Sequence, residues 1–370
     1  MKKDLLIIGG GYAGTQLVSQ LKNTFNITLV DENKFHIEQT EIHRYIGGKI
    51  SLGELAFPYE EFAKKNLIQF INTRVDNIDF ENNRVFFEDT TVSYDYVVLA
   101  TGSKTFFPKQ IKNLDLFKKD IKSLKVIKQF KEDFFTLLES PDNNKNIIIA
   151  GGGLSGIEIA IELAQKVKQS GLSSQDIKVT IVEQQDTILP GSHNFLIQQT
   201  KKVLDELHIE CVHGEFITEV EKNKIILSNK EEINYDLSLF VLGVGSEKLN
   251  NKQNIELNIK NQYIVDDYFQ INYYNNAFCI GDFAQTLTPE GKYNLPTAQL
   301  ANKQASLLAL NLKNLINKKD LIRKELILKG VLIDLGTNNA VGLIGNLKLS
   351  GYIAYILKRF TSYLHKSRFR

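Results

Sequence analysis

A motif of three glycines, G-x-G-x-x-G, occurs twice in the chain, each time between a short apolar run and a stretch with helical periodicity. The first copy lies in DLLIIGGGYAGTQLVSQL, which begins at Asp4, and the second lies in NIIIAGGGLSGIEIAIEL, which begins at Asn146. A strand, a glycine turn and a helix in this order open a βαβ unit. The first glycines, Gly9 and Gly151, are 142 residues apart, so the chain has room for two α/β domains.

The first motif has the residues that a dinucleotide requires. Gly9 permits the tight turn, Gly11 lets the backbone approach a pyrophosphate, and Gly14 lets the helix pack on the strand. Asp31 ends the strand NITLVD, 22 residues after Gly9, where its carboxylate can accept a hydrogen bond from a ribose hydroxyl. The complete pattern predicts that this unit binds a dinucleotide.

The second unit repeats the pattern at Gly151, Gly153 and Gly156. Glu183 ends the strand VTIVE, 32 residues after Gly151, and a polar loop at KVKQSGLSSQD accounts for a spacing longer than the usual ~20 residues. A carboxylate at Glu183 bonds a free ribose 2′-hydroxyl and repels a 2′-phosphate. The second unit is therefore expected to bind NADH rather than NADPH.

Two dinucleotides on one chain imply hydride transfer between them. The Gly-Asp pair of CIGD supports a flavin as one of the two, because Gly281 would let the backbone approach the cofactor and Asp282 would accept from a ribityl hydroxyl. A helix is expected to begin near Thr297, and its positive end would stabilise charge on the reduced flavin ring. The first unit is therefore expected to hold FAD.

Later segments indicate that one domain is inserted in the other. YDYVVLATGS, residues 94–103, reads as a buried strand that ends in the turn Thr101–Gly102, and YDLSLFVLGVG, residues 235–245, repeats this layout. NNAFCIGD then adds a strand that ends at Asp282. The predicted fold is α/β, with two Rossmann-like dinucleotide-binding domains, the NADH domain inserted in the FAD domain. The expected boundaries are 1–112 and 251–330 for the two halves of the FAD domain, 113–250 for the inserted NADH domain and 331–370 for a C-terminal segment.

Composition excludes several other classes. A formal charge of +2 argues against a general affinity for nucleic acid. The two cysteines, Cys211 and Cys279, are 68 residues apart, so they form no C-x-x-C pair and no thiolate metal cluster, and no metal site is expected. So few cysteines fit a reducing cytosol. The first strand is expected to begin near Asp4, so no secretory signal is expected before the fold.

These segments resemble the type II NADH:quinone oxidoreductases, a family within the two-dinucleotide-binding-domain flavoproteins. The resemblance covers GGGYAG, IHRYIGGKIS, LATGS, GGGLSGIEIA, IVEQQDTILP, AFCIGD, PTAQLANKQA and the tail KGVLIDLGTNNAVGLIGNLKLSGYIAYILKR. It implies non-covalent FAD, NADH on one flavin face, a quinone on the other, and no proton pumping. Carried over by position, the residues that would hold FAD are Gly9, Gly11, Gly14, Asp31, Thr101, Gly102 and Asp282, and those that would hold NADH are Gly153, Gly156 and Glu183.

The resemblance also implies residues for the chemistry. Glu158 stands where the family has a carboxylate near the nicotinamide that helps to deliver protons to the quinone. The family's quinone motif A-Q-x-A-x-Q is matched at Ala298, Gln299 and Ala301, but Lys303 replaces the second glutamine. Gln299 and Lys303 share one helix face at i, i+4 spacing, with Gln299 also beside the flavin. Lys303 is expected either to donate to a quinone carbonyl or to pair with an acid.

The tail differs from the rest of the chain in charge. No acidic residue follows Asp334, whereas six Lys and Arg residues do. Residues 351–370 are expected to form an amphipathic helix whose apolar arc of about 140° contains Tyr352, Ile353, Ile356, Leu357, Phe360, Tyr363 and Leu364. Lys358, Arg359 and Lys366 lie outside this arc, which predicts an interfacial helix on an anionic membrane, at the cytoplasmic face of the inner membrane. A helix packed in the core or in a homodimer stays open as an alternative.

Related activities have other requirements. Sulfide:quinone oxidoreductases share the scaffold but need cysteines close to the flavin, which Cys211 and Cys279 do not supply, and a relative of this type is kept as an alternative function. Thioredoxin-type reductases need C-x-x-C, which is absent. Peroxidase and CoA-disulfide reductase relatives place a redox cysteine where this chain has Ile42 and His43. A flavoprotein sensor like the apoptosis-inducing-factor relatives, with slow NADH turnover and a role in assembly, stays open, and rapid quinone-dependent NADH oxidation would distinguish the enzyme from it.

Overall fold

The first glycine motif joins strand β1 to helix α1 (Tyr12–Leu21) in a five-stranded parallel sheet. The computed structural model describes residues 1–369 except 89, 272, 289–290, 292 and 295. The strand order is β20-β9-β1-β2-β5, and every neighbouring pair is parallel. The strands span Asp4–Ile8 (β1), Asn26–Asp31 (β2), Gln69–Asn72 (β5), Tyr96–Leu99 (β9) and Ala277–Cys279 (β20). Strands β1, β9 and β20 are mostly apolar and buried, as is typical of a parallel sheet covered on both faces, whereas the edge strand β5 is partly exposed.

The second glycine motif joins β11 to α7 (Leu154–Gln169) in a four-stranded parallel sheet of the same internal order. This order is β13-β12-β11-β17, so β17 lies beside β11 as β9 lies beside β1. The similar sequences at 94–103 and 235–245 therefore form strands at equivalent positions in the two sheets. The four strands span Lys145–Ala150 (β11), Ile177–Glu183 (β12), Glu210–His213 (β13) and Leu237–Phe240 (β17).

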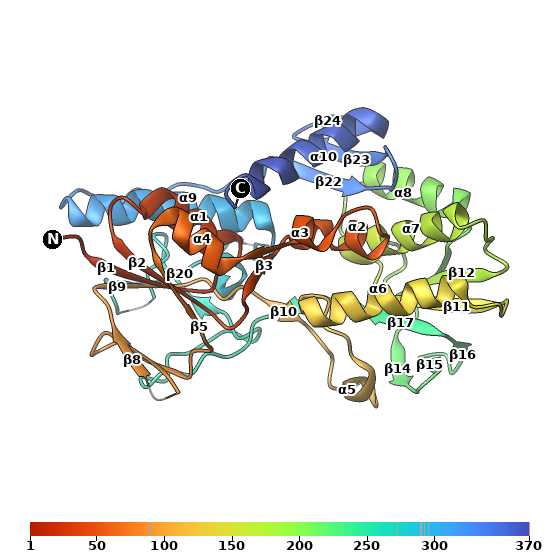
Figure 1. The fold of residues 1–370 in the computed structure, drawn as a ribbon, viewed down its shortest axis with the longest axis horizontal. Coiled ribbons are helices and arrows are strands. Elements are labelled where there is room, and N and C mark those ends of the chain that lie inside the picture. The colour runs from red at the N-terminus through yellow and green to blue at the C-terminus, as the bar shows by residue number, and fades with distance from the viewer. Residues whose placement is uncertain (89, 272, 289–290, 292, 295, 370) are drawn as a thin grey trace.

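The chain leaves the first sheet after β9, builds the second sheet, and returns to the first with β20. Two short strands, β10 (Lys104–Thr105) and β18 (Val244–Gly245), pair antiparallel where the chain leaves and returns. Figure 1 shows the first domain at the left and the inserted domain at the right. The prediction of an α/β fold with one Rossmann-like domain inserted in another is confirmed.

The remaining elements cover these sheets or connect them. Each domain has a three-stranded antiparallel sheet, formed by β6 (Asn77–Asp79), β7 (Arg84–Phe87) and β8 (Thr90–Ser93) in the first and by β14 (Ile217–Val220), β15 (Lys224–Leu227) and β16 (Glu232–Asn234) in the second. The helices are α2 (Ile42–Ile46), α3 (Leu52–Leu55), α4 (Tyr59–Asn66), α5 (Leu114–Phe117), α6 (Leu124–Glu139), α8 (Asn194–Glu206) and α9 (Ala298–Ile316), with 3-10 turns at Gln39–Glu41 and Gly281–Phe283. Two short pairs are β3 (Phe35–Ile37) with β4 (Ala56–Pro58) and β19 (Tyr263–Ile264) with β21 (Ala284–Gln285).

The C-terminal segment is a small antiparallel sheet followed by helix α10 (Gly351–Lys366). Its strands are β22 (Gly330–Asp334), β23 (Ala340–Ile344) and β24 (Leu347–Ser350). Ile333 and Val341 belong to the apolar core of the inserted domain. Figure 1 shows α10, in dark blue, running along one side of the molecule from the inserted domain towards the first domain. Among the described residues, no helix is both long enough and apolar enough to cross a bilayer.

Candidate active site

The two glycine loops have nearly the same backbone geometry. Gly9 has a φ of +104° and Gly151 a φ of +113°, values that side chains rarely tolerate. A Cβ at Gly9 would lie 2.3 Å from the carbonyl oxygen of Ala100, and a Cβ at Gly151 would lie 2.3 Å from that of Val241. The first glycine of each loop is therefore required both by its conformation and by the chain that follows β9 or β17.

The third and second glycines of each loop have opposite surroundings. A Cβ at Gly14 or Gly156 would lie 2.0 or 1.9 Å from the carbonyl oxygen of the first glycine of its own loop. A Cβ at Gly11 or Gly153 would meet no atom of the described chain within 4 Å. The space in front of the second glycine lies at a helix N-terminus, where an anion is favoured. Both loops therefore fit the pyrophosphate of a dinucleotide.

The acidic residues after the two motifs occupy equivalent positions. Asp31 Oδ2 accepts a hydrogen bond from the backbone N–H of Gly10 at 2.7 Å, and Glu183 Oε2 accepts one from Gly152 at 2.7 Å. The other oxygen of each acid accepts from the backbone N–H two residues further along. Because a carboxylate has about four acceptor positions, each acid holds its glycine loop and retains capacity for a ribose hydroxyl.

A cavity of about 240 Å³ lies beside the first loop. Its lining includes Gly9, Asp31 and the turn Thr101–Gly102, so the structure brings together residues that the sequence assigned to one cofactor. Charged side chains in the lining pair with one another, Arg74 and Lys104 with Glu32 and Glu247. A ribose bonded to Asp31 would lie in this cavity.

Asp282 meets the Thr101–Gly102 turn through Ser103. The Ser103 hydroxyl donates to Asp282 Oδ2 at 2.6 Å, and Lys122 Nζ donates to the hydroxyl and the carbonyl oxygen of Ser103, both at 2.7 Å. Burial lowers the pKa of Lys122, and the negative charge of Asp282 opposes this. Sequence reasoning missed Lys122, because it precedes α6 in a segment without a motif.

Gln304 is a second residue that sequence reasoning missed. It is fully buried on α9, where its Oε1 accepts from the backbone N–H of Gly281 at 2.6 Å and its Nε2 donates to Thr286 Oγ1 at 3.2 Å. Gln304 therefore holds the Gly281–Asp282 turn against α9. The sequence did contain a signal for this residue: Lys303 replaces the second glutamine of the quinone motif, and a glutamine, Gln304, follows directly.

Gln299 and Lys303 lie on one face of α9 and contact the segment before β22. Gln299 Oε1 accepts from the backbone N–H of Lys329 at 2.5 Å, and its Nε2 donates to the carbonyl oxygen of Gly330 at 3.4 Å. Lys303 Nζ donates to the carbonyl oxygen of Ile327. The two alternatives for Lys303 were a quinone carbonyl and an acid, and the partner that the structure gives it is a backbone carbonyl.

Glu158 is buried rather than exposed on a helix surface. Its Oε1 accepts from the backbone N–H of Asp334 at 2.8 Å and from Lys358 Nζ, and its Oε2 lies 3.5 Å from His43 Nδ1. His43 Nε2 lies 3.2 Å from Asp334 Oδ2. Burial alone would raise the pKa of Asp334, but the hydrogen bond to His43 and the charges of Lys358 and Arg359 hold it below its usual range. We call Glu158, His43, Asp334 and Lys358 the Glu158 cluster.

The basic residues of α10 face the protein, and the expectation that they face a membrane is wrong. Arg359 pairs with Glu41 at 2.8 Å and with Asp334 at 2.5 Å, and Lys366 pairs with Glu41 at 3.3 Å. Lys358 pairs with Glu158. The tail lacks acidic residues because its helix packs on carboxylates of the protein body. No anionic lipid is needed to explain this charge pattern.

The apolar arc of α10 is directed outward, as an interfacial helix requires. Its exposed members have between 50% and 71% of their surface accessible, and they are Tyr352, Ile353, Ile356, Phe360, Tyr363 and Leu364. An exposed apolar face of this size on a folded chain marks an interaction surface.

Neither cysteine is suited to thiol chemistry. Cys279 is fully buried in β20, and burial raises the pKa of its thiol well above the ordinary value. Burial also raises the pKa of Cys211, in β13 of the other sheet, to about 11. Both thiols are therefore protonated at neutral pH and are poor nucleophiles.

Known proteins match the chain along most or all of its length. A type II NADH:quinone oxidoreductase of Staphylococcus aureus (strain bovine RF122 / ET3-1) is 26% identical, and the match covers 97% of this chain and 94% of that protein. Among solved structures, NDH2 from Plasmodium falciparum in complex with NADH has a TM-score of 0.88 at 17% identity, covering 100% of this chain and 97% of the other. The sulfide:quinone oxidoreductase from Aquifex aeolicus has a TM-score of 0.83 at 20% identity, covering 99% and 91%.

These solved structures share the fold, and a family match carries the classification. Residues 3–305 match the pyridine nucleotide-disulphide oxidoreductase family, a span that includes both glycine loops and the CIGD turn. The chain therefore belongs to the pyridine nucleotide-disulphide oxidoreductase family.

Proposed function

We propose that this protein is a non-proton-pumping NADH:quinone oxidoreductase with non-covalent FAD in the first domain and NADH in the inserted domain. The observation that carries the proposal is the pair of equivalent glycine loops, each open in front of its second glycine and each held by an acid. The S. aureus relative, matched over nearly its whole length, is named for this activity. FAD, when bound, accepts a hydride from NADH and passes two electrons to a quinone.

The residues of each loop have separate tasks in this proposal. The N-termini of α1 and α7, at Gly11 and Gly153, would bind the pyrophosphates, and Asp31 and Glu183 would bind the riboses. Because Glu183 is already fixed by two backbone N–H groups, it cannot turn away from a 2′-phosphate without losing both. This supports a preference for NADH.

Asp282 would bind the ribityl chain from its position beside Ser103. The hydrogen bonds from Lys122 to Ser103 and from Ser103 to Asp282 fix the carboxylate before the cofactor arrives. Gln304 fixes the backbone of the same turn through Gly281. We infer that these residues orient the flavin, with Gln304 fully buried and Ser103, Lys122 and Asp282 partly buried.

The quinone side is assigned to α9 and the Glu158 cluster. Gln299 and Lys303 would border the quinone together with residues 327–330, to which both side chains are bonded. The overall reaction, NADH + H⁺ + quinone giving NAD⁺ and quinol, takes up one proton. Glu158, a buried carboxylate in contact with His43 and Lys358, is the group that we propose to pass it on.

We also propose that the protein binds the cytoplasmic face of the inner membrane as a peripheral protein. The exposed apolar face of α10 supports this, because a membrane quinone is dissolved in lipid and the site must come to it. Since the basic residues of α10 are paired internally, the attachment would depend on apolar contact rather than on lipid charge.

The purified protein tests this proposal directly. It should show a flavin spectrum and oxidise NADH rapidly only when a short-chain quinone is present. In stopped-flow experiments, Gln299→Ala should leave reduction by NADH near normal and slow reoxidation by quinone. Slow reduction with a long-lived charge-transfer complex would instead indicate a sensor. Sulfide-dependent quinone reduction is not expected, because the two thiols are protonated and lie in different sheets.

A further inference from the structure

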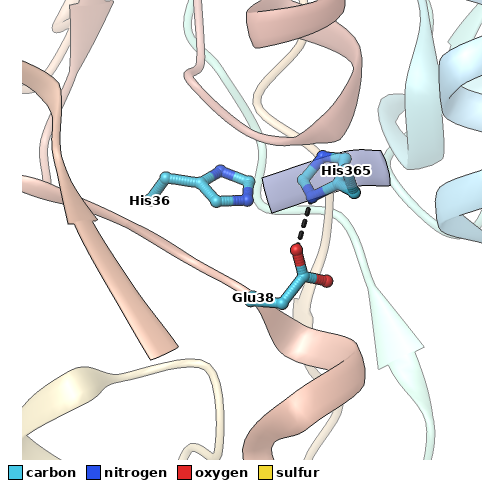
Figure 2. A group of neighbouring side chains, drawn as sticks. All are labelled: His36, Glu38 and His365. Carbon is cyan, nitrogen blue, oxygen red and sulfur yellow. Dashed lines mark hydrogen bonds and ion pairs between the residues drawn. The ribbon is translucent and has the colours of Figure 1, made fainter. Parts of the chain in front are cut away.

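Three buried side chains with metal-ligand chemistry meet beneath the first glycine loop: His36, Glu38 and His365 (Figure 2). His36 lies in β3, Glu38 directly follows β3, and His365 lies in the last turn of α10. Their exposed fractions are 2%, 1% and 6%. One ligand atom from each residue lies within 4.8 Å of the other two. Figure 2 shows the His36 ring pointing at His365, with the Glu38 carboxylate directed at the same gap.

His36 presents a buried lone pair at this gap. Its Nδ1 lies 3.0 Å from the carbonyl oxygen of Gly10. A carbonyl only accepts, so Nδ1 carries the ring proton. A second proton on the ring would be a buried donor without an acceptor in the described chain, so the lone pair lies on Nε2. Nε2 is buried, and no partner for it exists among the described residues.

Glu38 is ionised and oriented by neighbouring hydroxyl groups. Its Oε1 accepts from Tyr12 at 2.5 Å and from Thr40 at 2.6 Å, and its Oε2 is bonded to His365 Nδ1. His365 Nε2, like His36 Nε2, has no partner in the part of the chain that the structure describes. Two buried ring nitrogens without a described partner thus lie beside the Glu38 carboxylate.

We propose that His36, Glu38 and His365 bind a divalent metal ion of the zinc class. Two imidazoles and one carboxylate form a donor set that Zn²⁺ accepts, whereas Ca²⁺ and Mg²⁺ prefer oxygen ligands alone. The bond from His36 Nδ1–H to a backbone carbonyl and the hydroxyl groups on Glu38 are the outer contacts that orient metal ligands. When the ion binds, the ring nitrogen of His365 that becomes a ligand gives up its proton to solvent and forms the bond to the ion in its place.

A second histidine–carboxylate group, His43 with Glu162 and Asp334, is a weaker candidate. Glu162 pairs with Lys49 at 2.8 Å and Asp334 pairs with Arg359 at 2.5 Å. Both nitrogens of His43 already face carboxylates. An added cation would therefore meet charges that are balanced, and this group provides an internal comparison for the first.

The position of the proposed ion gives it a structural role. His365 belongs to α10, while His36 is bonded to Gly10 and Glu38 is bonded to Tyr12, on either side of Gly11. An ion held by all three residues would therefore fasten the C-terminal helix to the loop that we assign to the FAD pyrophosphate. The inference does not depend on the proposed enzymatic activity.

Binding of Zn²⁺ to the full-length flavoprotein tests the inference. After treatment with a chelator, the protein is dialysed against Zn²⁺, and elemental analysis and competition with a chromophoric chelator give the stoichiometry and affinity. One ion per chain is expected, with at least about tenfold weaker binding in His36→Gln and in His365→Gln. His208→Asn is the matched control, because His208 is exposed and its φ of 53° is one that asparagine tolerates.

Two further measurements keep the test decisive if a variant folds poorly. X-ray absorption at the zinc edge of the unaltered protein should show only nitrogen and oxygen neighbours, at about 2.0–2.1 Å. Zn²⁺ should also slow amide exchange in α10 of the unaltered protein. The inference is overturned if no Zn²⁺ binds, if sulfur neighbours appear, if His36→Gln binds as tightly as the control, or if His43→Gln loses the ion while His36→Gln keeps it.

Discussion

Replacing Arg359 with methionine would show how strongly α10 is held to the protein. Arg359 lies between Glu41 at 2.8 Å and Asp334 at 2.5 Å, and these two side chains are only 1% and 2% exposed. Removing one partner of a buried ion pair costs about 3–5 kcal/mol. The lower end applies here, because Glu41 keeps Lys366 and Asp334 keeps His43. At about 1.4 kcal/mol per factor of ten, a loss of about 3 kcal/mol raises the open population of α10 about a hundredfold.

Hydrogen–deuterium exchange on the full-length flavoprotein measures this population, since α10 amides exchange when the helix detaches. Arg323→Met is the matched control, because Arg323 pairs with Asp267 at 3.0 Å on the surface, where the two side chains are 71% and 55% exposed. Such a pair contributes about 0–1 kcal/mol. If α10 exchanges at the same rate in both variants, the internal ion pairs do not hold the helix.

Four further predictions address the cofactors, the membrane and pH. Gly11→Val should fold but purify without flavin, because its side chain fills the space left for the pyrophosphate, and a fully yellow protein would refute the assignment. The unaltered protein should have a kcat/KM for NADH about a hundredfold above that for NADPH, from like-charge repulsion at Glu183, and equal values would contradict this. Replacing both Ile353 and Phe360 with serine should weaken liposome binding about thirtyfold, or about 2 kcal/mol, with little dependence on salt, whereas strong salt dependence would restore a role for lipid charge. Burial lowers the pKa of His36 from 6.5 to about 4, so the unfolded chain binds a proton at higher pH than the folded chain does. The free energy of unfolding of the metal-free protein should therefore fall by about 3 kcal/mol as the pH is lowered from 6.5 to about 4. A pH series of urea titrations measures this decrease, and His36→Gln should lack the part that comes from His36.

The parts of the fold and site that follow from local sequence were predictable. The two glycine loops and their acids depend on residues that are close in sequence, and the insertion of one domain in the other follows from the order of these local motifs along the chain. The Thr101–Gly102 turn could be placed beside Asp31 because parallel strands present their carboxyl ends at one edge of a sheet. Helix α10 was also predictable, because its apolar periodicity is a local property of residues 351–370.

Features that depend on distant partners were not predictable from one sequence. A helical wheel locates the basic and apolar sides of α10 but does not say which side faces the protein. The carboxylates that decide this, Glu41, Glu158 and Asp334, come from three separate segments. The burial of Gln304 also depends on another element, because its partner is the turn after β20. The quinone motif singled out Lys303, whereas the buried glutamine that bonds the Gly281–Asp282 turn is Gln304, one position later.

The path of α10 has a mechanical consequence for the two domains. The connecting chain crosses between them at β10 and β18, which pair with each other and would by themselves allow the domains to rotate about that crossing. The C-terminal segment adds an attachment away from that axis, since β22 is rooted in the inserted domain and His365 is bonded to Glu38 in the first domain. Helix α2 of the first half already packs in the apolar core of the inserted domain, so a rotation at β10 and β18 would have to break both that contact and the attachment made by α10.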